Sequence, residues 1–226
     1  MNLAQAMKRI VPAVQDLKRR SLDQPGGETT MPPSLIALRD DRVLAVVTAP
    51  RLAAVLSCAQ TLAIGLAPQM LVVAAQVTLP ARGATDDVPA QAEGEGIAYT
   101  TFNRDRQASL AVQRYLVRGG EVSFGPPERG RPDDRTLMDE LARAMSQESL
   151  DPARVARKEV PVGAGDRPTF IPEPEGRRAL DAGTVKTAYD KVRGIGGTAL
   201  FLAADGTHAT RMLAAGLPQE CLLGGD

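Results

Sequence analysis

The chain has 226 residues, and its 27 basic and 27 acidic side chains leave no net charge. Proteins specialised for duplex nucleic acid usually carry a basic excess, because phosphate contacts supply most of their affinity, and this composition shows none. Only 3% of the residues are aromatic, which leaves little stacking surface for single strands, so the composition points to an ordinary globular chain of one large or two small domains.

Residues 2–22 predict an amphipathic helix, and we expect residues 1–24 to form a helical arm. Apolar side chains recur at alternating spacings of four and three and form a seam of Leu3, Met7, Ile10, Val14 and Leu17. Pro12 is expected to kink this helix or to begin a second one. The stretch QPGGETTMPP that follows predicts a linker. We therefore expect the seam to dock on another copy or on a partner protein, with the chain's own core or a membrane surface as alternatives.

Residues 34–149 predict the main α/β domain, which begins with strands at 35–39 and 42–48. Pro50 favours the start of a helix that ends at Gly65 and is apolar on nearly every side, which is typical of a buried helix. The continuous apolar run at 69–79 is typical of a central strand. Residues 52–81 carry no charge, but GLAPQ interrupts them too early for a membrane-spanning helix.

The rest of this domain predicts a loop, three strands and a helix. The loop occupies 80–96, and strands follow at 97–102, 109–117 and 121–125, with the last two joined at Gly119-Gly120. Residues 126–132 are expected to be a loop because of their prolines and glycine. A helix is predicted over 133–149, with Asp133 or Asp134 as its N-cap.

Residues 150–176 are rich in proline and predict a connection over the surface. Residues 177–226 then predict a small α-β-α-β segment, with a helix at 182–193, a strand at 198–204, a helix at 207–216 and a short strand at 220–223. GIGG at 194–197 closes a helix and precedes a strand, so it indicates a helix C-cap and not a phosphate loop. The expected fold is α/β (mixed α+β), a central mixed sheet with flanking helices. The C-terminal segment packs on the main domain or on a partner.

Two groups of residues are candidates for ligand binding. One is the strand-to-helix turn at 204–208, where Asp205 or Thr207 would cap the helix and His208, the only histidine, would lie in its first turn. We favour a structural corner there, with a ligand site as the alternative. The other group holds four arginines that could converge across a hairpin to bind carboxylate or phosphate: Arg104, Arg106, Arg114 and Arg118. A solvated strand face is the simpler interpretation of that group.

No complete catalytic or metal-binding pattern is present in the sequence. Acidic pairs at 40–41, 86–87 and 133–134, with Asp139 and Glu140, lie where turns and helix starts favour carboxylates. Cys58 and Cys221 with one histidine cannot supply a four-ligand zinc site alone. We therefore expect no metal and no cofactor, and favour a non-catalytic, cytoplasmic interaction or assembly protein that self-associates or docks on a protein partner. The alternative is an enzyme acting on a small ligand or phosphoester, using the 204–208 turn with Asp or Arg partners.

Overall fold

The computed structural model describes residues 3–23, 30–39, 42–81, 93–105, 107–130, 135–146, 182–202 and 206–223. In this part of the chain, one eight-stranded sheet has the order β6-β5-β4-β3-β1-β2-β7-β8. Neighbours pair antiparallel except β7 and β8, which pair parallel. The strands are β1 (Ser34–Arg39), β2 (Arg42–Thr48), β3 (Met70–Leu79), β4 (Gly94–Asn103), β5 (Ala108–Arg118), β6 (Glu121–Gly130), β7 (Thr198–Leu202) and β8 (Leu222–Leu223). The expected mixed sheet with flanking helices is confirmed.

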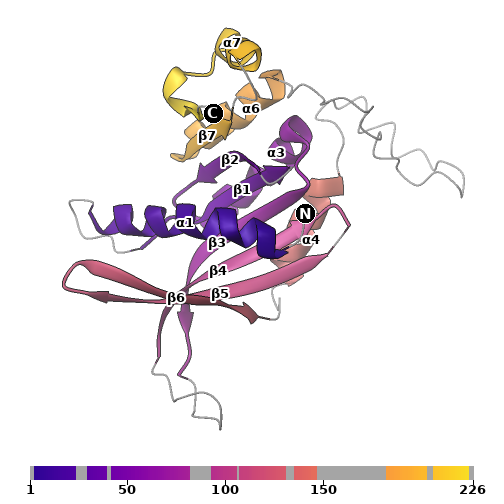
Figure 1. Cartoon of the computed structure of the whole chain (residues 1–226). Helices are drawn as coiled ribbons and strands as arrows, with labels where there is room; N and C mark the ends of the chain where they lie inside the picture. Colours follow the sequence, from indigo (N-terminus) through magenta and orange to yellow (C-terminus); the bar gives the residue numbers. More distant parts are fainter. Residues whose placement is uncertain are drawn as a thin grey trace, which may run out of the picture.

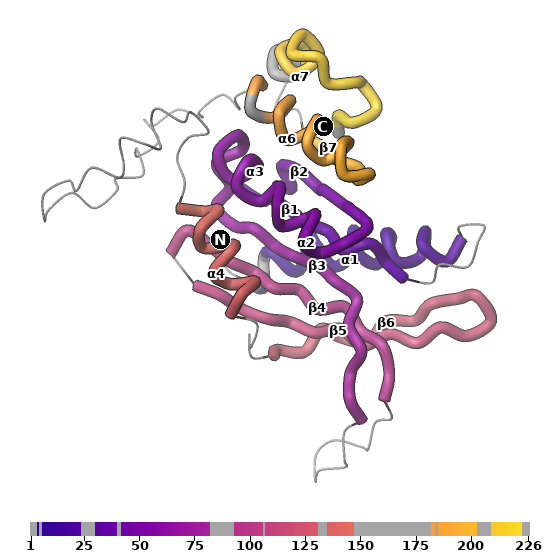
Figure 2. Tube along the Cα trace, turned by 180° about the vertical axis from the view of Figure 1, so that it is seen from behind, coloured from indigo at the N-terminus to yellow at the C-terminus, as the bar shows by residue number. Residues whose placement is uncertain are grey.

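Helices cover both faces of this sheet. The helix α1 (Leu3–Leu22) lies across one face, and α2, α3 and α4 lie on the other (Figures 1 and 2). Each face has its own apolar core, and α6 and α7 contribute to the core opposite α1. The bounds of these helices are α2 (Leu52–Ser57), α3 (Ala59–Leu66), α4 (Arg135–Ser146), α6 (Ala182–Gly194) and α7 (Gly206–Ala214), and a single 3₁₀ turn, η1 (Gln219–Cys221), precedes β8.

Strand β3 occupies the centre of the sheet, as its continuous apolar run predicts. Leu71 and Val73 belong to the core under α2–α4, whereas Val72 and Ala74 belong to the core under α1. Because side chains of a strand alternate between faces, a strand covered on both sides needs apolar residues at every position.

The apolar stretch after β2 forms two helices where the sequence predicts one. Cys58 ends α2 with a backbone N–H donated to Val55 O at 3.1 Å, and α3 begins at Ala59. The helix α3 packs against the sheet and also touches α4 and α6, which explains why it has almost no polar side. Arg39 closes its C-terminal end by donating from Nη2 to Leu66 O at 2.7 Å.

Strand β6 corrects the expectation of a loop at 126–132 for residues 126–130, and residues 131–132 lie outside the described part of the chain. It runs on to Gly130 and passes through Pro126 and Pro127. β6 is the outermost strand, and proline is tolerated at a sheet edge or beside a register shift because the ladder of hydrogen bonds is incomplete there. The register also shifts opposite this region, between Gln113 and Tyr115 of β5.

The GIGG segment is confirmed as the C-cap of α6. Gly196 has a φ of +71°, and Gly197 donates its N–H to Val192 O at 2.9 Å. A Cβ at Gly197 would lie 2.4 Å from Thr48 O, so this position needs glycine to let β7 approach β2. β7 then pairs with β2, and the C-terminal segment extends the main sheet.

Candidate binding groove

The structure places the apolar seam of α1 in the chain's own core, which corrects the expectation that it docks on a partner. Ile10 and Val14 have no exposed surface and pack on the sheet, while Met7 and Leu17 are partly buried beside them. The side chain of Leu3 lies outside the described residues. Pro12 stands on the exposed side of an uninterrupted helix. Without α1, the apolar strand residues of this core would face water. Removing their surface from water is what drives the helix onto its own sheet.

Sequence reasoning missed one residue of this helix, Lys18, which is fully buried. The position lies four residues after Val14, so the helical repeat that identifies the seam also places Lys18 on its buried face. Burial lowers the pKa of the Lys18 ammonium, and the charge of Glu95 partly opposes that shift.

A polar cluster surrounds the Lys18 ammonium and joins α1 to three strands. Lys18 donates from Nζ to Gln76 Oε1 at 3.1 Å and lies 4.7 Å from the centre of the Tyr115 ring. Gln76 donates from Nε2 to Glu95 Oε1 at 2.9 Å, and Tyr115 donates its hydroxyl to Glu95 Oε2 at 2.8 Å. Burial and the Glu95 carboxylate both raise the pKa of Tyr115. Lys18 has polar partners and is inaccessible, so we infer that its contacts position the helix on the sheet.

The three described arginines of the candidate group, Arg104, Arg114 and Arg118, do not converge. Arg104 donates from Nε to Pro68 O at 2.8 Å and from Nη2 to Ala67 O at 2.7 Å, so its guanidinium holds the turn after α3. Arg114 donates to Pro80 O at 3.2 Å and stands opposite Gly96, near the other end of the β4–β5 pair. Arg104 follows the end of β4, where Thr101 stands opposite Ser109 of β5. Ser109 and Arg114 are five residues apart on β5, which corresponds to about 17 Å at about 3.4 Å per residue. Arg118 is exposed and lies still farther along β5, where it stands opposite Glu121 in the strand register.

The other candidate residues fall largely outside the described residues. This holds for Arg106, for Asp205 and for the side chains of Thr207 and His208, although the backbone of the last two forms the start of α7. The acidic pairs at 40–41, 86–87 and 133–134 lie outside as well. Asp139 is exposed on α4 beside the half-exposed Glu140. Within the described ranges, no three His, Cys, Asp or Glu side chains gather where they could hold a metal.

In the part of the chain that the structure describes, an apolar groove of about 720 Å³ lies between the first half of α1 and the outer strands β5 and β6. Its walls come from α1 and from the β5–β6 hairpin, which is remote from α1 in the sequence, and its surface is mostly apolar. The lining residues are Ala4, Met7, Lys8, Val11 and Pro12 of α1, Ser109 and Ala111 of β5, and Pro127, Glu128 and Arg129 of β6.

Side-chain size explains where the groove lies. Under the second half of α1, the Tyr115 and Phe124 rings fill the space, with their centroids 6.0 Å apart and the Arg19 guanidinium 5.4 Å from the centre of Phe124. Under the first half, β5 presents the small side chains of Ser109 and Ala111, so the space beside the helix stays open. The polar cluster fixes α1 at its far end and thereby holds the groove wall in place.

A scan of protein-family models and searches of curated proteins and of solved structures each found no match to this chain. Among the described helices, none combines the length and the apolar character that crossing a membrane requires. The fold and the groove are therefore the basis for assigning a function.

Proposed function

We propose that this chain is a non-catalytic interaction protein that binds a segment of a partner protein in the groove between α1, β5 and β6. The apolar groove is the observation that carries this proposal. A cytoplasmic location, expected from the sequence, belongs to the same proposal. The proposal does not include self-association through the α1 seam, because Ile10 and Val14 are buried in the chain's own core.

The shape of the groove favours a macromolecule over a small ligand. Small-molecule sites usually enclose most of their ligand, whereas this groove is open to solvent. Met7 and Val11 are only partly buried although large and apolar, and a partner side chain placed between them and Pro127 would remove that surface from water.

The test is selection of binding peptides with and without the apolar groove wall. A displayed library of random peptides of about 16 residues, about four helical turns, is panned on the full chain. The selected peptides are then titrated against wild type and the double variant Met7→Gln, Val11→Asn. If each side chain loses about 40 Å² of apolar contact with the peptide, binding should weaken by about tenfold or more.

A matched control separates the groove from the rest of the surface. Leu200 and Leu213 are exposed apolar residues at 38% and 44% and do not line the groove. The double variant Leu200→Gln, Leu213→Gln should leave peptide affinity unchanged. If no peptide is enriched, or if selected peptides bind the groove variant as tightly as wild type while both remain folded by circular dichroism, the proposed function is wrong.

A further inference from the structure

We infer that the segment bound in this groove is an amphipathic helix that carries carboxylates along the border of its apolar face. This inference rests on the proposed function and specifies the chemistry of the partner. It follows from two features of the groove: the charges on its rim and the prolines in the strand that forms its outer wall.

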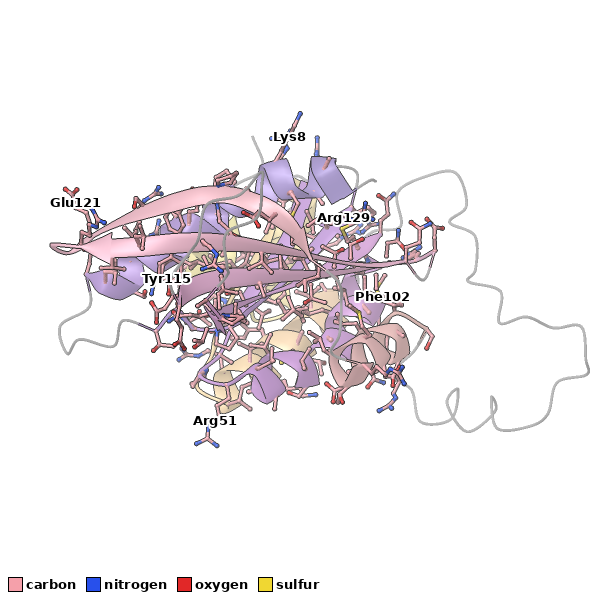
Figure 3. The ribbon with its side chains drawn as sticks, turned by 90° about the horizontal axis from the view of Figure 1, so that it is seen from below. Lys8, Arg51, Phe102, Tyr115, Glu121 and Arg129 are labelled. Carbon is pink, nitrogen blue, oxygen red and sulfur yellow. The ribbon has the colours of Figure 1, made fainter. Side chains whose placement is uncertain are left out.

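Two cations flank the apolar surface. Lys8 projects from α1 and Arg129 from β6, both are exposed, and Figure 3 places them on the α1 side of the sheet, opposite Arg51. Neither has an ion-pair partner in the part of the chain that the structure describes. Glu128 is the only acidic residue in the described lining, and it already interacts within the chain. The rim therefore attracts negative charge on an incoming segment.

The outer wall disfavours the addition of an extended strand. Strand addition needs a row of free backbone N–H and C=O groups along the edge. Pro126 and Pro127 supply no N–H in the part of β6 that borders the groove, and the register of β6 on β5 shifts there. A segment bound here is held by its side chains, and a helix presents a continuous apolar stripe at spacings of three and four.

The experiment uses the peptides selected on wild type and a charge-reversed groove. The library is panned in parallel on wild type and on the double variant Lys8→Glu, Arg129→Glu. Peptides from wild type should show apolar residues at helical spacing bordered by Asp or Glu, and those from the variant should carry Lys or Arg at the same positions. The best wild-type peptide is then synthesised with a fluorescent label, beside a twin with each acidic residue replaced by Lys.

Fluorescence anisotropy should show the acidic peptide binding wild type about tenfold tighter than its Lys twin, with the preference inverted on the charge-reversed variant. The preference should shrink at high salt, because exposed charges are screened. The control variant Arg51→Glu, Arg193→Glu makes the same charge change at two exposed residues away from the groove and should keep the wild-type preference. Figure 3 shows Arg51 on the side opposite α1, and Arg193 belongs to α6, which packs on the core opposite α1.

Three results would overturn the inference and leave the proposed function standing. Equal binding of both twins, with both weakened by Met7→Gln, Val11→Asn, would show apolar docking without charge selection. Equal binding of a twin in which one central residue is Pro would show that the segment is not helical. A homodimer of wild type that dissociates in the groove variant, measured by light scattering, would identify a second copy as the occupant. Loss of all groove dependence would instead refute the proposed function itself.

Discussion

Replacing Ile10 with Ala tests whether α1 belongs to the chain's own core. Ile10 is fully buried in the cluster beneath α1. The substitution removes three carbons, worth about 2.4 kcal/mol at about 0.8 kcal/mol each. A partly relaxed cavity adds to this, so we expect a loss of about 3 kcal/mol in the free energy of unfolding. That loss corresponds to a melting temperature roughly 10 °C lower for a chain of this size.

The assay is urea unfolding followed by circular dichroism at two protein concentrations roughly a hundredfold apart. A seam buried within one chain gives the same loss at both concentrations, whereas a seam docked on a second copy gives a midpoint that rises with concentration. Arg9→Ala is the control, because Arg9 is exposed on the same helix and should change stability by no more than about 0.5 kcal/mol. A loss below about 1 kcal/mol for Ile10→Ala, or a concentration-dependent midpoint, would refute the packing of α1 described here.

Three further outcomes are expected from urea unfolding of single variants. The pKa of Lys18 is lowered on folding from 10.5, so the unfolded chain holds more protons on Lys18 just below that pH. The contribution of Lys18 to the free energy of unfolding should therefore grow as pH approaches 10.5, and Lys18→Met should lose this contribution. The pKa of Tyr115 is raised on folding from 10.0, so the folded chain holds more protons on Tyr115 above that pH. The contribution of this group to the free energy of unfolding should therefore fall by about 1.4 kcal/mol per pH unit above pH 10. Tyr115→Phe should remove that share of the fall. Gly197→Ala should lower the free energy of unfolding by at least about 2 kcal/mol, because its Cβ would meet Thr48 O at 2.4 Å. Gly194→Ala should change it little, because the space around its Cβ is open. Equal effects would contradict the close approach of β7 to β2.

Local patterns in the sequence were sufficient to place most elements. The repeat of Ile10 and Val14 identifies α1, the continuous apolar run identifies β3 as central, and GIGG identifies the end of α6. These signals depend on neighbours within one or two turns of the chain, where spacing and glycine conformation act directly. The side of α1 that faces the core therefore followed from sequence, and continuing the same repeat would have added Lys18 to it.

Only the tertiary structure decided which surfaces meet. The order of the strands places β1 between β3 and β2, and the antiparallel register separates Arg104 from Arg114. No local pattern specifies either, because strand pairing joins residues far apart in the chain. The same holds for the groove: Met7 and Arg129 are remote in sequence, and the space between them exists because β6 lies at the edge and the β5 residues beneath are small. The sequence by itself determined the apolar stripe of α1. Only the tertiary structure decided what that stripe binds, because one face of the sheet carries apolar side chains that would be exposed to water without the helix.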